Sequence, residues 1–189
     1  MQDTGANAII IDPGENGTEL ISRISEHKLN LTGILCTHAH YDHITSASEI
    51  LRLFPVKFYL HKDDFKLLSQ ANFYKMIFGG EQFINTPKEI IDLSLHPTIM
   101  GLIDFPIFIT HAPGHTEGGV YIQIGQSLFT GDNILSYKIG RSDLPGGDSI
   151  KLIKSIELLM LFHGELILYP GHGKPMALNT VKTRLLMDI

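Results

Sequence analysis

Short runs of apolar, β-branched residues alternate with longer stretches of helical periodicity along the chain of 189 residues. The runs predict strands at residues 8–11, 33–36, 56–60, 106–109, 120–124, 127–129 and 166–169. Apolar residues spaced three and four apart predict helices at residues 18–28, 46–54, 63–74 and about 149–162, with another after residue 179. Ser46 and Glu49 have the spacing of a capping box, and Asp148 is a good N-cap.

The mixture of strands and helices, without strict alternation, predicts an α+β fold with helices outside packed sheets. No repeat or domain linker interrupts the chain, and 43% hydrophobic with 19% charged residues fits one domain over residues 1–189. A net charge of −5 disfavours nucleic acid as a partner. No apolar run is long enough for a membrane span, and the N-terminus has no signal-peptide pattern, so we expect a cytoplasmic protein without membrane contact. The one cysteine, Cys36, cannot form an internal disulfide, and we expect it to be a buried core residue without a catalytic role.

Ten histidines are the compositional excess, and three of them lie in one short segment. His38, His40, Asp42 and His43 follow a predicted strand and precede a predicted helix, so they occupy a loop at a strand end. Imidazole and carboxylate groups are the donors that zinc and ferrous iron prefer. We therefore interpret the segment as a metal site, against the alternative of solvated surface histidines.

Three later turns have the same form, a strand followed by a potential ligand beside glycine. They contribute His115, Asp132 and His172. Glycine lets the backbone turn sharply and approach a metal closely. Seven donors are too many for one tetrahedral ion but enough for two ions that share a carboxylate.

These ordered motifs, THAHYDH, APGHT, TGDN and PGHG, resemble the metallo-β-lactamase fold, as does Asp12-Pro13-Gly14 after the first strand. Residues 139–148 are similar to the glyoxalase II-like (hydroxyacylglutathione hydrolase) subgroup. The resemblance extends over about residues 8–174. It implies a four-layer αβ/βα sandwich, here lacking the first strand that usually precedes residue 8.

The resemblance also implies roles for individual residues. Two divalent ions are expected, zinc first, with iron or manganese as alternatives. Asp42 and Asp132 are the expected catalytic carboxylates, with Asp132 bridging the ions, and Asp12 is expected to support a ligand imidazole. The implied ligands are His38, His40 and His115 for one ion, and Asp42, His43 and His172 for the other.

The implied activity is hydrolysis of a thioester, an S-acylglutathione such as S-lactoylglutathione, by a hydroxide that bridges the metals. No Gly-x-Ser-x-Gly motif suggests a protein nucleophile instead. Three alternatives stay open: a persulfide dioxygenase with one ferrous iron, a lactonase or β-lactamase, and a metal-binding domain without catalysis. The helical domain that completes the glutathione pocket of larger glyoxalase II enzymes has no counterpart here, which predicts weak recognition of the glutathione tail.

Other candidates concern substrate and partners. Lys138 and Arg141 follow the bridging carboxylate and are candidates to bind a substrate carboxylate, with Tyr137 a weaker one. His111 ends a strand that leads to a ligand, so it is a candidate to support the site. An unpaired edge at residues 8–11 would be a template for another chain, so we expect a homo-oligomer.

Overall fold

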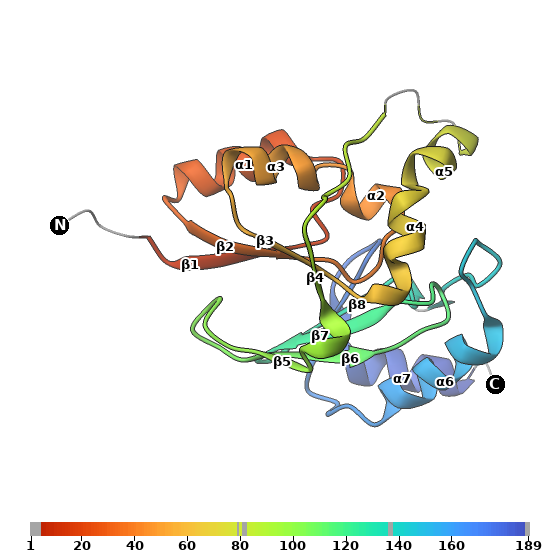
Figure 1. Ribbon diagram of the computed structural model, residues 1–189. Helices are drawn as coiled ribbons and strands as arrows, with labels where there is room; N and C mark the ends of the chain where they lie inside the picture. The colour runs from red at the N-terminus through yellow and green to blue at the C-terminus, as the bar shows by residue number, and fades with distance from the viewer. Residues whose placement is uncertain (1–4, 79, 81–82, 136–137, 188–189) are drawn as a thin grey trace.

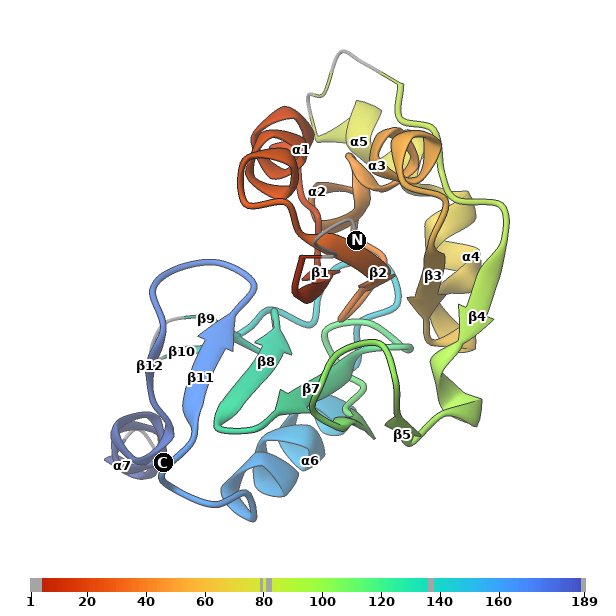
Figure 2. The ribbon, with the colours of Figure 1, turned by 90° about the vertical axis from the view of Figure 1, so that its left-hand side faces the viewer.

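The computed structural model describes residues 5–78, 80, 83–135 and 138–187. Two sheets lie face to face in the middle of the molecule, and helices cover both outer faces (Figure 1). The view in Figure 2 shows the two sheets as separate layers, with α1 and α3 on one side and α6 and α7 on the other. The predicted α+β sandwich of four layers is therefore present.

The first sheet is parallel, in the order β1-β2-β3-β4. Parallel strands need crossover connections, and α1 and α3 supply the first two of them. Alternate residues of these strands enter different cores, so that Ile34 faces the helices while Leu35 faces the second sheet. The elements are β1 (Asn7–Ile11), α1 (Gly17–Glu26), β2 (Asn30–Leu35), α2 (Tyr41–Ile44), α3 (Ala47–Leu53), β3 (Lys57–Leu60) and β4 (Ile90–Asp92).

The second sheet has the order β12-β11-β8-β7-β6-β5. Strand β11 runs parallel to β8, and the other neighbours are antiparallel, so β6, β8 and β11 all point the same way. Their carboxyl ends therefore meet at one edge. The elements of this half are β5 (Thr98–Ile99), β6 (Ile107–His111), β7 (Val120–Ile124), β8 (Ser127–Gly131), α6 (Ser149–Met160), β11 (Ile167–Pro170), β12 (Met176–Ala177) and α7 (Leu178–Met187). Between β8 and α6, β9 (Ile134–Leu135) and β10 (Lys138–Ile139) form a separate antiparallel pair.

The prediction of one continuous helix over residues 63–74 is wrong, because the segment is helical but interrupted. The segment forms a 3₁₀ turn, η1 (Lys62–Asp64), followed by α4 (Phe65–Ser69) and α5 (Ala71–Ile77), and a second 3₁₀ turn, η2 (Leu93–Leu95), occurs later. Gln70 lies between α4 and α5 with φ −99° and ψ 3°, outside the helical range, and this residue separates the two helices.

The capping box at Ser46 is also wrong, although the helix that follows it is present. The Ser46 hydroxyl accepts the backbone N–H of Gly17 at 2.9 Å and has no capping hydrogen bond within its own helix. A tertiary contact between α1 and α3 therefore replaces the local cap. Asp148 caps α6 as predicted, because its side chain accepts the N–H of Lys151 at 3.0 Å.

Strand β1 is an edge strand, with β2 as its neighbour in the sheet order. Its apolar sequence, Asn7-Ala8-Ile9-Ile10-Ile11, makes an edge that another chain can pair with. Self-association through this edge stays a prediction. Light scattering over a concentration series should show a mass above that of one chain, and a strictly monomeric protein at every concentration would contradict it.

Among the described residues, no helix has the length and apolar character to cross a membrane.

Candidate metal centre

The structure brings all seven predicted ligands together at one end of the sandwich. His38 and His40 follow β2, while Asp42 and His43 lie in the short helix α2. The other three lie in the turns after β6, β8 and β11, the strands whose carboxyl ends meet. They are His115, Asp132 and His172.

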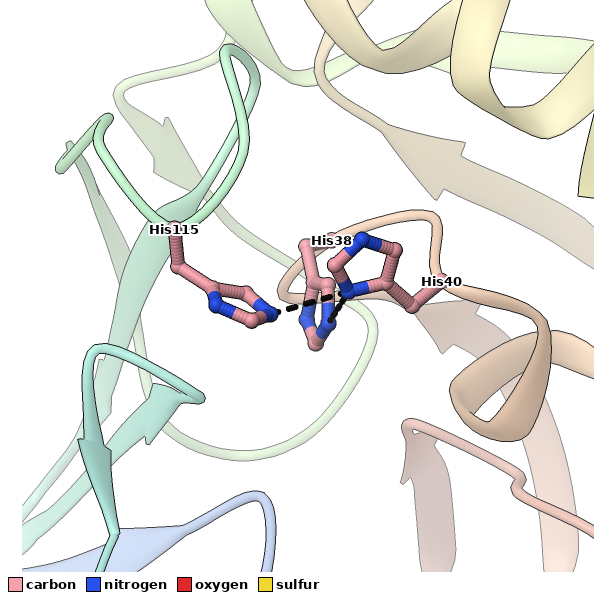
Figure 3. Close-up of side chains that lie close together, drawn as sticks. All are labelled: His38, His40 and His115. Atoms are coloured by element: carbon pink, nitrogen blue, oxygen red, sulfur yellow. Dashed lines mark hydrogen bonds between the residues drawn. The ribbon is translucent and has the colours of Figure 1, made fainter. Parts of the chain in front are cut away.

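Three buried imidazoles form the first cluster (Figure 3). His40 Nδ1 lies 3.1 Å from His38 Nε2 and 2.9 Å from His115 Nε2. Burial, together with the charge of His115, lowers the pKa of His40 to about 4, and burial also lowers the pKa values of His38 and His115. Neutral imidazoles with converging nitrogens are the form in which histidine binds a cation.

The second cluster contains Asp42, His43 and His172 and is more open to solvent. Asp42 Oδ2 lies 3.0 Å from His172 Nε2 and 3.8 Å from His43 Nε2. The His172 side chain is 55% exposed, whereas that of His43 is 3% exposed. We therefore expect an ion in this cluster to exchange more readily than one in the first.

Asp132 lies between the two clusters. Its Oδ1 is 3.4 Å from His43 Nε2, and its Oδ2 is 3.7 Å from His115 Nε2 and 3.5 Å from His172 Nε2. Burial acts to raise the pKa of Asp132, but the neighbouring His43 and His115 lower it overall, so the carboxylate is ionised. One carboxylate facing two groups of imidazoles is the arrangement needed to bridge two cations.

Four buried side-chain atoms have no hydrogen-bond partner among the described residues: His40 Nε2, His43 Nε2, Thr130 Oγ1 and Asp132 Oδ1. His43 Nε2 and Asp132 Oδ1 face each other at 3.4 Å. Leaving such atoms unpaired costs about 1–3 kcal/mol each. A divalent cation between them would satisfy both, and nitrogen and carboxylate oxygen are the donors that zinc and iron take. The residues present therefore fit a metal centre.

Asp12 orients the His43 ring by binding the ring nitrogen that does not face Asp132. The His43 Nδ1–H donates to Asp12 Oδ2 at 3.1 Å, which leaves Nε2 directed at Asp132. Asp12 is itself fixed, because it accepts both the N–H and the hydroxyl of Thr37, at 2.7 and 2.6 Å. Burial would lower the pKa of His43, but the carboxylates of Asp12 and Asp132 raise it to about 10. A cation bound at Nε2 would replace the proton that this pKa implies.

Two groups that position the ligands were not predicted. The buried Asp64 accepts the N–H of Ala39 at 2.9 Å, the hydroxyl of Thr116 at 2.9 Å and the N–H of Gly118 at 2.7 Å. It therefore ties the loop of the first histidines to the loop of His115. The only signal in the sequence, two adjacent acidic residues, was that of a helix start.

The second unpredicted group is the backbone carbonyl of Arg141. It accepts the Nδ1–H of His115 at 2.7 Å, so that Nε2 of this imidazole faces the cluster. A backbone acceptor leaves no signature in side-chain identity, and for this reason no sequence pattern could have found it.

A groove of about 210 Å³ opens beside the ligands. Arg141 lines it, as predicted for a substrate-binding residue, but the guanidinium makes two bonds to Asp143, at 2.8 and 2.9 Å. Lys138 is exposed in β10 and is not among the residues lining the groove, and Tyr137 lies outside the described residues. The lining residues are His40, Tyr41, Asp42, Tyr74, Phe78, His115, Asp132, Leu135, Arg141, Leu144 and Pro145.

His111 is exposed, and its described contacts do not include a ligand side chain. Its Nε2–H donates to the carbonyl of Glu117 at 2.9 Å, and its ring stacks on His61 with the centroids 4.1 Å apart. The described contacts therefore give no support for the predicted supporting role.

Gly171 lies directly against two of the ligands and leaves no room for a side chain. A Cβ atom there would lie 2.1 Å from Asp132 Oδ1 and 2.6 Å from His43 Cε1. We expect Gly171→Ala to weaken metal binding at the second cluster about 10-fold to 100-fold, the range for disturbing the groups that orient metal ligands. Competition with a chromophoric chelator would measure the change. Gly125→Ala is the control, because that position is open and its cost is limited to about 1 kcal/mol of backbone strain at φ +54°. Unchanged zinc affinity in Gly171→Ala would contradict the placement of these ligands.

Known proteins of one superfamily are similar to this chain. The family model of the metallo-beta-lactamase superfamily matches residues 2–172. The chain belongs to this superfamily. A relative in Methanocaldococcus jannaschii, named "Probable metallo-hydrolase MJ0888", is 37% identical over 90% of this chain and 84% of its own. The hydroxyacylglutathione hydrolase GloC of Haemophilus influenzae is 36% identical, over 90% of this chain and 82% of its own. A solved superfamily structure, TTHA1623 in a di-iron-bound form, superimposes with a TM-score of 0.81 at 30% identity, covering 92% of this chain and 85% of that one.

The comparisons confirm the predicted superfamily and fold. They also indicate a metallo-hydrolase with divalent metal binding. The four-layer sandwich is thus the superfamily fold in this chain.

Proposed function

We propose that the protein is a thioester hydrolase dependent on two divalent ions, acting on an S-acylglutathione such as S-lactoylglutathione. The observation that carries the proposal is Asp132, placed between two ligand clusters and lining the adjoining groove. The similarity to the hydrolase GloC supports the substrate class. Zinc is the proposed metal, and the di-iron form of a similar structure makes iron the first alternative.

Each residue then has a part in the proposed reaction. His38, His40 and His115 would hold one ion, Asp42, His43 and His172 the other, and Asp132 both. When bound, the ions would lower the pKa of water and polarise a carbonyl oxygen. Asp12 keeps the His43 ring oriented, and the groove beside the clusters would hold the substrate with its carbonyl toward them.

The test is metal analysis of protein purified without added metal, followed by hydrolysis assays on a panel of thioesters before and after metal removal. We expect thioester hydrolysis that is lost with the metal and restored by zinc. Oxygen uptake with glutathione persulfide by an iron-containing protein would identify a dioxygenase instead. Full metal occupancy without turnover of any thioester would contradict the proposal, and assays on a lactone and a β-lactam would then separate those hydrolases from a binding domain.

Arg141 provides a prediction about substrate binding. Because its guanidinium lines the groove but is held by an exposed aspartate, we expect Arg141→Ala to raise KM by about 3-fold to 10-fold with little change in kcat. Asp143→Ala releases the guanidinium and should lower KM for an acidic thioester. Steady-state kinetics separate the two constants, and a change confined to kcat would exclude Arg141 as a binding residue.

A further inference from the structure

One wall of the metal groove is aromatic. Tyr41 precedes the ligand Asp42 in α2, while Tyr74 and Phe78 come from α5 and its C-terminal cap. Tyr74 and Phe78 are four residues apart, so they lie on the same face of the helix. The rings of Tyr41 and Phe78 are stacked, with centroids 6.5 Å apart and planes at 20°. The three side chains therefore form a continuous surface that begins beside a metal ligand.

Two leucines add apolar surface to the part of the groove that the metal ligands do not occupy. Leu135 and Leu144 line it as well, and Arg141, with its charge paired, is the cationic side chain among the lining residues. Phe78 is 51% exposed, although it is large and apolar. Apolar surface exposed within a concave site favours a ligand that removes it from water.

We propose that the surface formed by Tyr41, Tyr74 and Phe78, here called the aromatic wall, binds the hydrocarbon part of an acyl group. This inference rests on the proposed thioester hydrolysis and specifies its substrate class: acyl groups of several carbons are preferred to short polar ones such as lactoyl. A groove of about 210 Å³ is smaller than the roughly 300–1,000 Å³ of typical ligand pockets. It therefore holds the acyl chain, and the thiol carrier extends into solvent.

The kinetic test uses acyl thioesters of one thiol, N-acetylcysteamine, from acetyl to hexanoyl. Burying a methylene fully contributes up to about 4-fold, so four methylenes on an open wall should raise kcat/KM about tenfold. Phe78→Ala should reduce this gain to about twofold. Met76→Ala is the matched control, because Met76 lies on the same helix, is 61% exposed and does not line the groove. A wild-type protein without chain-length dependence would overturn the proposal.

A binding test without catalysis separates this inference from the proposed function. The chain has no tryptophan, so Phe78→Trp introduces a single fluorophore into the aromatic wall, and Met76→Trp places one outside it. The probe is S-hexyl-N-acetylcysteamine, a thioether that lacks the thioester bond, compared with its S-methyl analogue on the protein as purified. We expect a saturable blue shift with the hexyl probe in Phe78→Trp alone.

The two experiments have distinct outcomes. A blue shift confined to Phe78→Trp supports the aromatic wall even if no thioester is hydrolysed, in which case the proposed function alone fails. An equal shift in Met76→Trp would overturn the proposal, because the apolar surface of α5 would then be an unspecific or partner-binding face. Hydrolysis without a shift in either variant would overturn it as well.

Discussion

Asp132→Ala should lower kcat/KM for thioester hydrolysis by about 10³-fold or more, the largest effect of any single substitution at the site. The carboxylate faces both ligand clusters, at 3.4 Å from His43 and 3.7 Å from His115, so its removal takes a ligand from both ions at once. Metal catalysis of this kind contributes several kcal/mol of transition-state stabilisation, and each 1.36 kcal/mol is a factor of ten. Steady-state assays of zinc-supplemented variants measure the loss.

The matched control for this prediction is Asp104→Ala. Asp104 is an exposed aspartate in the loop before β6, at the opposite end of that strand from the ligands. It should leave kcat/KM within about twofold of the wild-type value. Activity of the Asp132 variant within tenfold of wild type would show that the carboxylate does not bridge the metals.

The second large effect should come from Asp64, which touches no predicted ligand side chain. Asp64→Ala leaves the N–H of Ala39, the hydroxyl of Thr116 and the N–H of Gly118 without their acceptor. Breaking a buried charged network of this kind costs about 3–5 kcal/mol. Urea unfolding of the metal-free protein should show this loss, and metal affinity should fall with it because two ligand loops lose their connection.

Asp63→Ala tests whether the effect is specific to Asp64. The Asp63 side chain is 42% exposed, so its removal should change the free energy of unfolding by less than about 1 kcal/mol. The account of Asp64 fails if both variants unfold at the same urea concentration as wild type.

The parts of the fold that the sequence predicted are those encoded locally. The strands β2, β7 and β11 each contain a short apolar run, and each of the three later ligand turns combines a strand end with glycine and histidine or aspartate. The THAHYDH segment places four ligands within six residues, so no long-range information was needed to find them. Local patterns of this kind can be predicted because the hydrophobic period and the turn residues indicate the same strand boundaries.

The features that escaped prediction depend on contacts between distant parts of the chain. Asp64 accepts hydrogen bonds from residues 25, 52 and 54 positions away. The Ser46 hydroxyl accepts the N–H of Gly17, 29 residues earlier, instead of a backbone N–H of its own helix. The hydrophobic periodicity of residues 63–74 continues through Gln70, although the helix is interrupted there. It therefore predicted one straight helix and not the position of α5 beside α2. The aromatic wall depends on that placement and for the same reason appears only in three dimensions.

Metal content measured after stepwise chelation tests the central claim, that two ion sites share Asp132. Wild-type protein should bind two equivalents of zinc and lose the first readily, because one cluster contains the 55% exposed His172 while the other is buried. Asp42→Ala should bind one equivalent, held by His38, His40 and His115, and Asp132→Ala should bind less than one after the same dialysis. Two equivalents retained by Asp42→Ala, or a single equivalent in the wild-type protein, would contradict the account.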